Sequence, residues 1–170
     1  MGSQEVVASY ARLFVESRKM VAEIRSSART RLVWFVAVAG FAFLNGPPFW
    51  SAIASRTFAG TDLVLLALPW AMSALLAVVT HFFVDEAAVK DDRYFVQKLA
   101  MVDLHLEAIK EGEDDPLEML QIIDGTHTDL KKPKAAAERY ACWARWLERI
   151  TFALLVLGFI WSLAIPLVLP

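Results

Sequence analysis

The side chains that could carry chemistry in this chain are few, and the histidines His81, His105 and His127 are the first to consider. A haem held between membrane helices needs two histidines at matching depth, and only His81 lies within a long apolar run. A zinc site needs closely spaced His or Cys ligands, and the single cysteine, Cys142, has none within ten residues. We therefore expect no cofactor and no metal.

The carboxylates and the sequence motifs also argue against catalysis. The acidic segment EGEDDPLE, residues 111–118, lacks the alternating ligands and central glycine of a calcium loop. We interpret it as a solvated turn that leads into a helix N-terminus. The chain has no P-loop and no G-x-G-x-x-G, H-E-x-x-H or G-x-S-x-G motif. We therefore expect that the protein is not an enzyme.

Three long apolar blocks contain the remaining polar side chains of interest. The blocks are residues 32–44, 63–84 and 150–170, and none contains Asp, Glu, Lys or Arg. Proton pumps and ion-coupled transporters normally need such charged groups inside the membrane. Hydroxyl side chains can line a water-filled pore. The candidates for such a lining are Ser73, Thr80, Thr151 and Ser162.

The elements that must position these residues follow from hydropathy. The chain is 57% hydrophobic, yet 21% of its 170 residues are charged and lie between the apolar blocks. A membrane-spanning helix needs about 20 apolar residues. We predict an all-α integral membrane protein with three transmembrane helices, whose extensions form a cytoplasmic helical hairpin or bundle. The predicted segments are a cytoplasmic amphipathic helix (1–31), transmembrane helix 1 (32–46), an outer connection with an interfacial helix (47–62), transmembrane helix 2 (63–84), a cytoplasmic helical segment (85–134), the cytoplasmic start of the third helix (135–149) and transmembrane helix 3 (150–170).

The distribution of Lys and Arg predicts the orientation of these spans. Residues 1–31 carry six basic residues, residues 45–62 carry one, and residues 85–149 carry ten. This bias predicts a multi-pass protein of the plasma (inner) membrane with a cytoplasmic N-terminus and an external C-terminus. Trp34, Trp143 and Trp146 would then lie near the cytoplasmic interface, and Trp50 near the outer one.

Small residues at helical spacing predict the faces through which the spans pack. The predicted helix-packing residues are Ala39, Ala42, Gly46, Ala67, Ala71, Ala74, Gly158 and Ser162. These faces could pack within one chain or against other chains.

Two apolar stripes with alternating spacings of 4 and 3 predict a seam on the cytoplasmic helices. Its members are Val6, Tyr10, Leu13, Met20, Ile24, Phe95, Leu99, Val102, Leu106 and Ile109. The seams could pack within the chain or between chains, and the N-terminal helix could instead lie flat on the membrane.

The stretch NGPP, residues 45–48, interrupts the first apolar block. We expect Asn45 and Gly46 to end the first span, because Gly tolerates the left-handed turn at a helix C-terminus. Pro47 or Pro48 would then begin a short interfacial helix through Ala54. Further along, Pro116 is expected to start a short helix that ends at Asp124-Gly125, and Pro133 to exclude helix until about Ala135.

The order of parts over residues 5–130 resembles the SLATT group of bacterial pore-forming defence effectors. The residues that carry the likeness are the stripe from Ala88 to Ile109 and the connection NGPPFWSAIASRTFAGTD. Members of that group have an N-terminal helix, two spans with a short connection and a long cytoplasmic helix. The third span, from Ile150, departs from this pattern. The resemblance implies an oligomeric channel or pore-forming membrane protein gated by its cytoplasmic bundle.

The alternative from another class is a non-catalytic polytopic membrane protein that acts through helix assembly. It would be an accessory or scaffolding subunit of a membrane complex, or a homo-oligomer with a cytoplasmic helical platform. Uncharged spans and small-residue faces favour this hypothesis over the pore. The expected partners are the lipid bilayer and other membrane protein chains, whether copies of itself or different ones. The net charge of −2 gives no reason to expect nucleic acid.

Overall fold

The computed structural model describes residues 3–54, 60–111 and 116–168, and this part of the chain forms helices with no strand. The helices are α1 (Ser3–Ala54), α2 (Thr61–Glu111), α3 (Pro116–Asp124) and α4 (Thr128–Val168). Three stretches within α1, α2 and the α3–α4 region are long and apolar enough to cross a membrane. The predicted all-α class with three candidate spans is therefore confirmed.

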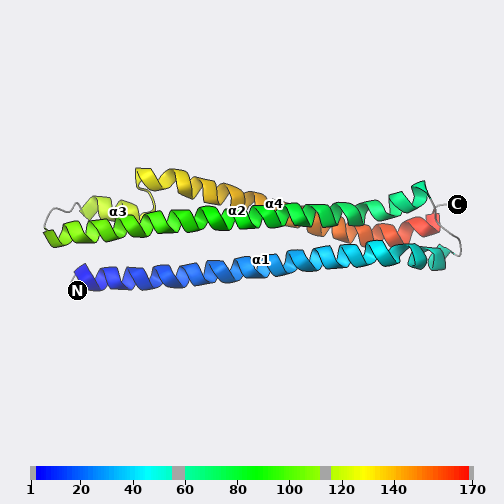
Figure 1. Cartoon of the computed structure of the whole chain (residues 1–170), viewed down its shortest axis with the longest axis horizontal. Coiled ribbons are helices and arrows are strands. Elements are labelled where there is room, and N and C mark those ends of the chain that lie inside the picture. The colour runs from blue at the N-terminus through cyan, green and yellow to red at the C-terminus, as the bar shows by residue number, and fades with distance from the viewer. Residues whose placement is uncertain (1–2, 55–59, 112–115, 169–170) are drawn as a thin grey trace.

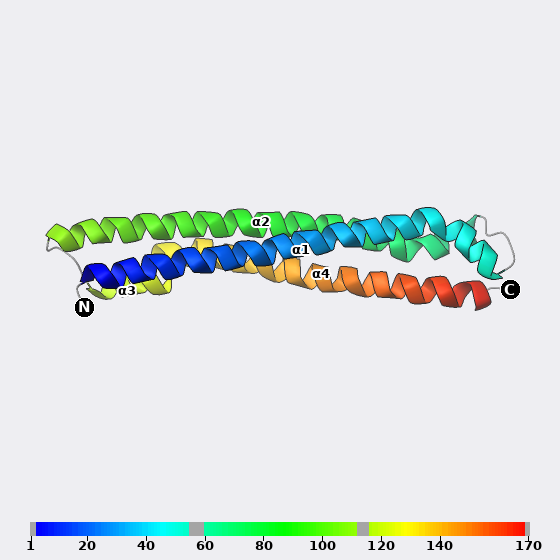
Figure 2. The ribbon, with the colours of Figure 1, turned by 90° about the horizontal axis from the view of Figure 1, so that it is seen from below.

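The long helices lie along one axis and α2 is the central element. α2 runs antiparallel to α1 and α4, and it contacts α4 most extensively, then α1, then α3 (Figure 1). The short helix α3 lies at the same end as the N-terminus, whereas the C-terminus lies at the end where α1 leads into α2. The perpendicular view shows the same elongated arrangement (Figure 2).

Charge divides the molecule into two halves along its length. In what we call the apolar half, residues 32–54, 63–84 and 150–168, no Asp, Glu, Lys or Arg occurs. The charged half comprises residues 3–31, 85–111 and 116–149. Helices α1 and α2 have 52 and 51 residues, so each is roughly 75–80 Å long at 1.5 Å per residue. A hydrocarbon core of about 30 Å can therefore hold less than half of either helix.

The border between the halves lies at one level on all three long helices. Arg29 of α1 bonds Asp85 of α2, with its Nε 2.9 Å from Oδ1. Arg31 of α1 bonds Glu148 of α4, with Nε 2.7 Å from Oε1. These charged residues directly adjoin the apolar runs of their helices. The three helices therefore pass from apolar to charged surroundings together.

Small side chains let the helices approach each other in the apolar half. The main cluster there contains Ala39, Leu66, Ala67, Trp70 and Leu155, with Ala42 and Ala74 packed against it. Gly158 meets the Trp70 indole, where an added Cβ would lie 3.1 Å from the ring. Of the predicted packing residues, Ala39, Gly46, Ala67, Gly158 and Ser162 are buried within the chain, whereas Ala71 is exposed.

The four hydroxyl residues considered as a pore lining lie buried between α2 and α4. The Thr151 hydroxyl donates to the Leu147 carbonyl (2.8 Å) and the Thr80 hydroxyl to the Leu76 carbonyl (2.7 Å). The two hydroxyl oxygens lie 3.4 Å apart, so one donates to the other only when it turns away from its carbonyl. Ser73 donates to the Thr151 carbonyl (3.3 Å). The Trp70 indole N–H donates to the Ser162 hydroxyl (2.9 Å). These contacts satisfy the hydroxyls inside the chain and join the two helices.

The prediction that the first span ends at Asn45 and Gly46 is wrong, because α1 continues through both prolines to Ala54. Pro47 and Pro48 remove the donors that would serve the carbonyls of Phe43 and Leu44. Tertiary packing holds the last turns in place: Trp50 is 1% exposed, joins the main apolar cluster and covers Gly46. The Trp50 side chain therefore packs inside the chain, and its place near an outer membrane interface stays a prediction.

The start of the last helix also differs from the prediction. α4 begins at Thr128 rather than Ala135, so Pro133 lies within its early turns. The ring Nδ1 of His127 accepts a hydrogen bond from the Asp129 N–H (3.3 Å), which caps the helix. Leu130 is fully buried against Ile122 and Tyr94, and this packing favours helix from the first turn.

The α2–α4 hydroxyl pair can be tested with a double-mutant cycle. Thr80→Val and Thr151→Val keep the side-chain shape but remove the hydroxyls. Hydrogen bonds between membrane helices contribute about 0.6 kcal/mol on average, and about 1.7 kcal/mol at most. We expect each substitution to lower the free energy of unfolding by roughly that amount, and the double variant to lose less than the sum.

The measurement is reversible unfolding in mixed detergent micelles. Thr30→Val is the matched control, because the exposed Thr30 hydroxyl bonds only the Ser26 carbonyl of its own helix (3.0 Å). Its effect should add fully to that of Thr151→Val. Full additivity for the Thr80 and Thr151 pair would contradict a coupling between α2 and α4.

Candidate functional site

The charged half carries the ion pairs between helices and the histidine contacts, and the candidate site lies there. Helix α3 packs against α2, and the chain then turns sharply into α4 at Gly125, which has φ +67°. The Gly125 N–H donates to the Ile122 carbonyl (3.0 Å) and the Thr126 N–H to the Gln121 carbonyl (2.8 Å). This pair of bonds is a Schellman C-cap, as the Asp124-Gly125 signal predicted.

Two side chains of α2 secure this turn. The Lys98 ammonium donates to the Ile123 carbonyl (2.6 Å) near the C-terminus of α3, where positive charge is favoured. Burial lowers the pKa of Lys98, and nearby Lys134 lowers it further, while Asp124 raises it. Tyr94 packs against Gly125, and burial raises its pKa, with smaller contributions from Asp91 and Glu138. Lys98 and Tyr94 thus fasten α3 to the central helix.

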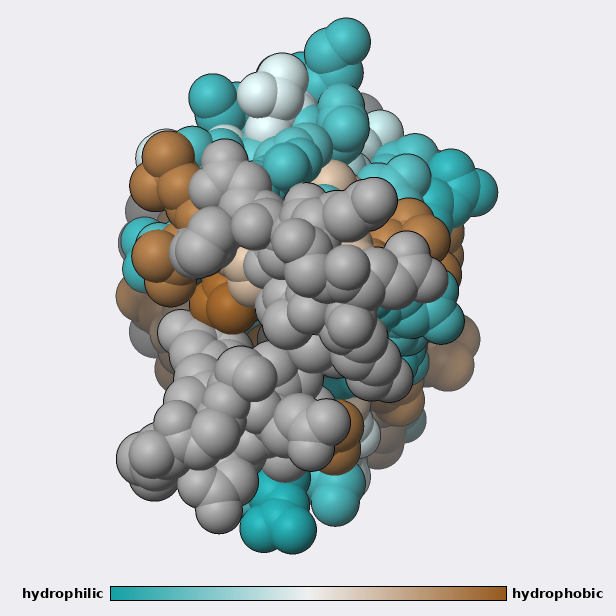
Figure 3. All heavy atoms as spheres, turned by 90° about the vertical axis from the view of Figure 1, so that its left-hand side faces the viewer, coloured by the Kyte–Doolittle hydropathy of each residue, from teal (hydrophilic) through white to brown (hydrophobic). Residues whose placement is uncertain are grey.

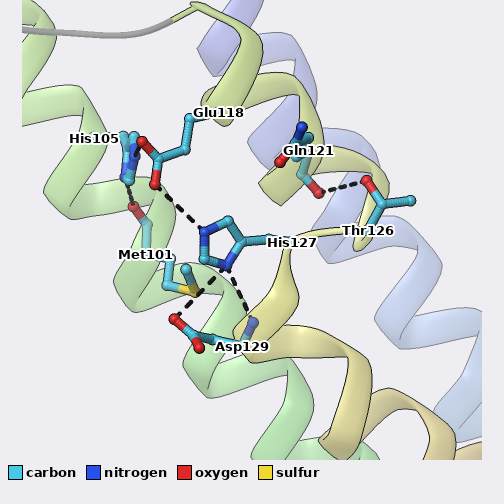
Figure 4. Close-up of polar contacts among 7 residues, drawn as sticks. All are labelled: Met101, His105, Glu118, Gln121, Thr126, His127 and Asp129. Atoms are coloured by element: carbon cyan, nitrogen blue, oxygen red, sulfur yellow. Dashed lines mark hydrogen bonds and ion pairs between the residues drawn. The ribbon is translucent and has the colours of Figure 1, made fainter.

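Glu118 brings two histidines together beside this turn (Figure 4). Its Oε2 lies 3.6 Å from Nε2 of His105 on α2, and its Oε1 lies 3.4 Å from Nε2 of His127. The Nδ1 of His127 accepts from the Asp129 N–H, so its Nε2 carries the proton that faces Glu118. The Nδ1 of His105 faces the Met101 carbonyl (3.0 Å), which can only accept, so that nitrogen is protonated. This cluster links α2, α3 and the start of α4.

Sequence reasoning placed His105 and His127 apart, because the contact depends on where three segments meet in space. Among the described residues, no group of three or more His, Cys, Asp or Glu side chains is arranged to hold a metal ion. His81 lies elsewhere, with its Nε2 3.7 Å from Oδ2 of Asp85 at the border.

An ionic stripe joins α1 to α2 in the charged half. Arg18 lies 3.1 Å from Asp92, Arg25 is paired with Asp91, and Arg29 with Asp85. Partner numbers fall as the α1 numbers rise, as antiparallel helices require. The arginines recur at spacings of 7 and 4, which is one helix face. Their aspartate partners on α2 are spaced by 1 and 6 residues, so no matching period in the sequence indicated this stripe.

The predicted apolar seam is only partly used within the chain. Phe95 and Val102 pack against the cluster of Tyr94, Ile122 and Leu130. Met20, Ile24 and Leu99 are exposed instead, because the face of α1 toward α2 is the ionic stripe. The remaining seam residues lie outside the described side chains: Val6, Tyr10, Leu13, Leu106 and Ile109.

Several other apolar side chains in the charged half are exposed. On α2, Val89, Val96 and Leu104 are exposed by 45%, 59% and 65% and share one face. On α3, Leu117 and Leu120 are also exposed. Seen from the end of the molecule that carries α3, hydrophobic surface lies between hydrophilic patches (Figure 3). This exposed apolar surface lies beyond the apolar half, where lipid tails would not cover it.

Comparison with known proteins finds no matching family model, no matching curated protein and no matching solved structure. The site must therefore be interpreted from its own geometry.

The turn at Gly125 gives a testable prediction about how α3 is held against α2. Gly125→Ala places a β-carbon in a left-handed conformation, at a cost of about 1–2 kcal/mol, and against the Tyr94 hydroxyl. We expect a lower free energy of unfolding and faster amide hydrogen exchange in α3. Adding Tyr94→Phe should restore part of the loss, because it removes the colliding hydroxyl.

Gly60→Ala is the matched control. Gly60 has φ +59°, but an added β-carbon there meets nothing within 4 Å. Gly60→Ala should lower the free energy of unfolding only through the left-handed backbone conformation. Adding Tyr94→Phe should restore none of that loss. If Tyr94→Phe fails to lessen the effect of Gly125→Ala, the hydroxyl contact does not hold the turn.

Proposed function

We propose that this protein is a non-catalytic, multi-pass membrane subunit that works by assembling with other membrane protein chains through its charged half. The observation that carries the proposal is the exposed apolar face of α2 formed by Val89, Val96 and Leu104. Apolar patches outside the membrane are typical of protein-binding surfaces. Helix assembly would cover this face and remove the cost of its exposure to water.

The shape of this face supports the proposal. Val89, Asp92, Arg93, Val96 and Gln97 line a shallow hollow of about 450 Å³. Apolar side chains at its centre and charged ones at its rim are the arrangement of a protein interface. The face points away from Tyr94, which packs inward, so a partner helix could dock without disturbing the fold.

The internal use of the hydroxyls argues for assembly rather than for a pore lined by them. Ser73, Thr80, Thr151 and Ser162 are all buried between α2 and α4 of one chain. Water would reach them only if this interface opened and its hydrogen bonds broke. A pore-forming assembly would therefore need another lining, and the described residues offer no specific observation in favour of one.

The proposal includes a location and an orientation. The charged half, with most of the basic residues, would face the cytoplasm, and the C-terminus would lie outside the plasma (inner) membrane. Exposed Trp34, Trp143 and Trp146 flank the border at Arg31 and Glu148, as interfacial tryptophans would.

A charge placed on the exposed face should weaken assembly. Val96→Asp puts a carboxylate at the centre of the hollow, where a partner would have to desolvate it. We expect the native complex in mild detergent to lose at least one subunit's mass, as measured by light scattering and native mass spectrometry.

Gln97→Asp is the matched control, since it adds the same charge to the neighbouring exposed position on the rim. It should leave the mass unchanged or nearly so. Wild-type protein that is monomeric in native membrane extracts, with no stoichiometric partner lost on Val96→Asp, would overturn the proposal.

The orientation can be tested with the native thiol. Cys142 is the single cysteine and is exposed. A membrane-impermeant maleimide should label it only after cells are opened. With Cys142→Ser, a new cysteine in Ala52→Cys should be labelled in intact cells, because Ala52 is exposed in the last turn of α1, at the end of that helix away from the charged half. Labelling of Cys142 in intact cells would reverse the orientation.

A further inference from the structure

A second surface of the charged half has a different chemistry. A groove of about 660 Å³ opens between α1, α2 and α4 beside the border. Its floor is built from alanines, and small side chains on all three helices are the reason that space remains between them. They are Ala28, Ala87, Ala137, Ala141 and Ala144.

The rim of the groove is cationic. Five basic and three acidic residues line it, so its formal charge is +2. Two of the acids are committed to ion pairs, Asp91 with Arg25 and Glu148 with Arg31. Lys134, Arg145 and Arg149 form no ion pair within the described part of the chain, and Glu138 is the remaining acid. Arg145 Nε donates to the Ala141 carbonyl (3.3 Å), which leaves its other N–H groups for a ligand. The groove therefore has positive charge available for an anion.

The membrane-facing end of the groove is at lipid headgroup depth. The last charged residues before the apolar runs of α1 and α4 are Arg31 and Arg149. The Arg31–Glu148 bond, 2.7 Å from Nε to Oε1, fixes these two ends at one level. Arg145 lies about one helical turn further from the apolar run of α4, about 6 Å from Arg149 along the helix axis. Headgroup layers are roughly 5–8 Å thick, so both arginines can lie within one.

We propose that this groove binds the headgroup of an anionic phospholipid from the leaflet at the border. Arg145 and Arg149 would contact the phosphate, since guanidinium groups match phosphate oxygens in a bidentate geometry. The alanine floor would receive the glycerol backbone, and the acyl chains would follow the exposed apolar surface of α1 and α4 into the membrane. Basic pockets at the ends of membrane helices are known to hold anionic lipid headgroups in this manner.

The test measures lipid binding to the purified full chain. Native mass spectrometry would follow the binding of phosphatidylglycerol and of phosphatidylcholine to wild-type protein in mild detergent. We expect a preference for phosphatidylglycerol. Arg145→Gln/Arg149→Gln should weaken its binding by about thirtyfold, given the usual contribution of two basic residues at a membrane surface. Arg145→Lys/Arg149→Lys keeps the charge but loses the bidentate geometry, so it should bind more weakly than wild type and more tightly than the Gln pair.

The matched control is Lys132→Gln/Arg139→Gln, which removes the same charge from exposed positions of α4 outside the groove. It should keep the preference. Ala141→Phe fills the floor without changing charge, and it should also weaken binding. Circular dichroism of each variant checks that the helices form, so a loss of binding in a folded protein is interpretable.

Four outcomes would overturn the proposal. Wild-type protein could bind both lipids equally, or the control pair could lose as much affinity as the groove pair, which would indicate general surface charge. Inorganic phosphate at millimolar concentration could displace the lipid completely, which would indicate a site for a free anion. Retained preference in both Arg145→Gln/Arg149→Gln and Ala141→Phe would place the lipid elsewhere.

Discussion

The separation of charged from apolar residues at one level along all three long helices is the constraint on which this structure depends. In a membrane each long helix would have to keep its charged residues out of the hydrocarbon region, and the bonds of Arg29 to Asp85 and of Arg31 to Glu148 hold the borders at one level. Had the borders been staggered by even two turns, one helix would carry charges at the depth of another's apolar run. The common border aligns the helices along their axes, and the packing on either side follows from this alignment.

The two halves then use different interactions to hold the same helices. In the apolar half, close approach of alanines and glycines and polar contacts of hydroxyls hold α2 against α4. In the charged half α1 is attached to α2 by Arg18, Arg25 and Arg29. The pairs of Arg18 and Arg29 are exposed and contribute about 0–1 kcal/mol each, whereas the pair of Arg25 with Asp91 is half-buried. In the charged half, α1 is therefore attached to α2 less firmly than α4 is. This leaves room for the groove between α1, α2 and α4.

Hydropathy and small-residue spacing were sufficient to predict the spans and most of their packing faces, because both signals are local. They missed the continuation of α1 through Pro47 and Pro48, which depends on Trp50 packing against residues of α2. The same two signals also did not predict the polar contacts of the candidate site. The ionic stripe requires the register between two helices, and the contact of His105 and His127 with Glu118 requires three segments to meet. Such pairings are not encoded in the period of any one helix.

The hydroxyl contacts between α2 and α4 also bear on how the chain enters a membrane during synthesis. Thr80 and Thr151 each have a carbonyl partner on their own helix, so neither hydroxyl needs the other helix for an acceptor. Trp70 and Ser73 have their acceptors, the Ser162 hydroxyl and the Thr151 carbonyl, on α4, which is made later. Insertion of α2 alone would thus leave the Trp70 indole N–H and the Ser73 hydroxyl without these acceptors. The arrival of α4 would satisfy both and convert two independently inserted helices into a fixed pair.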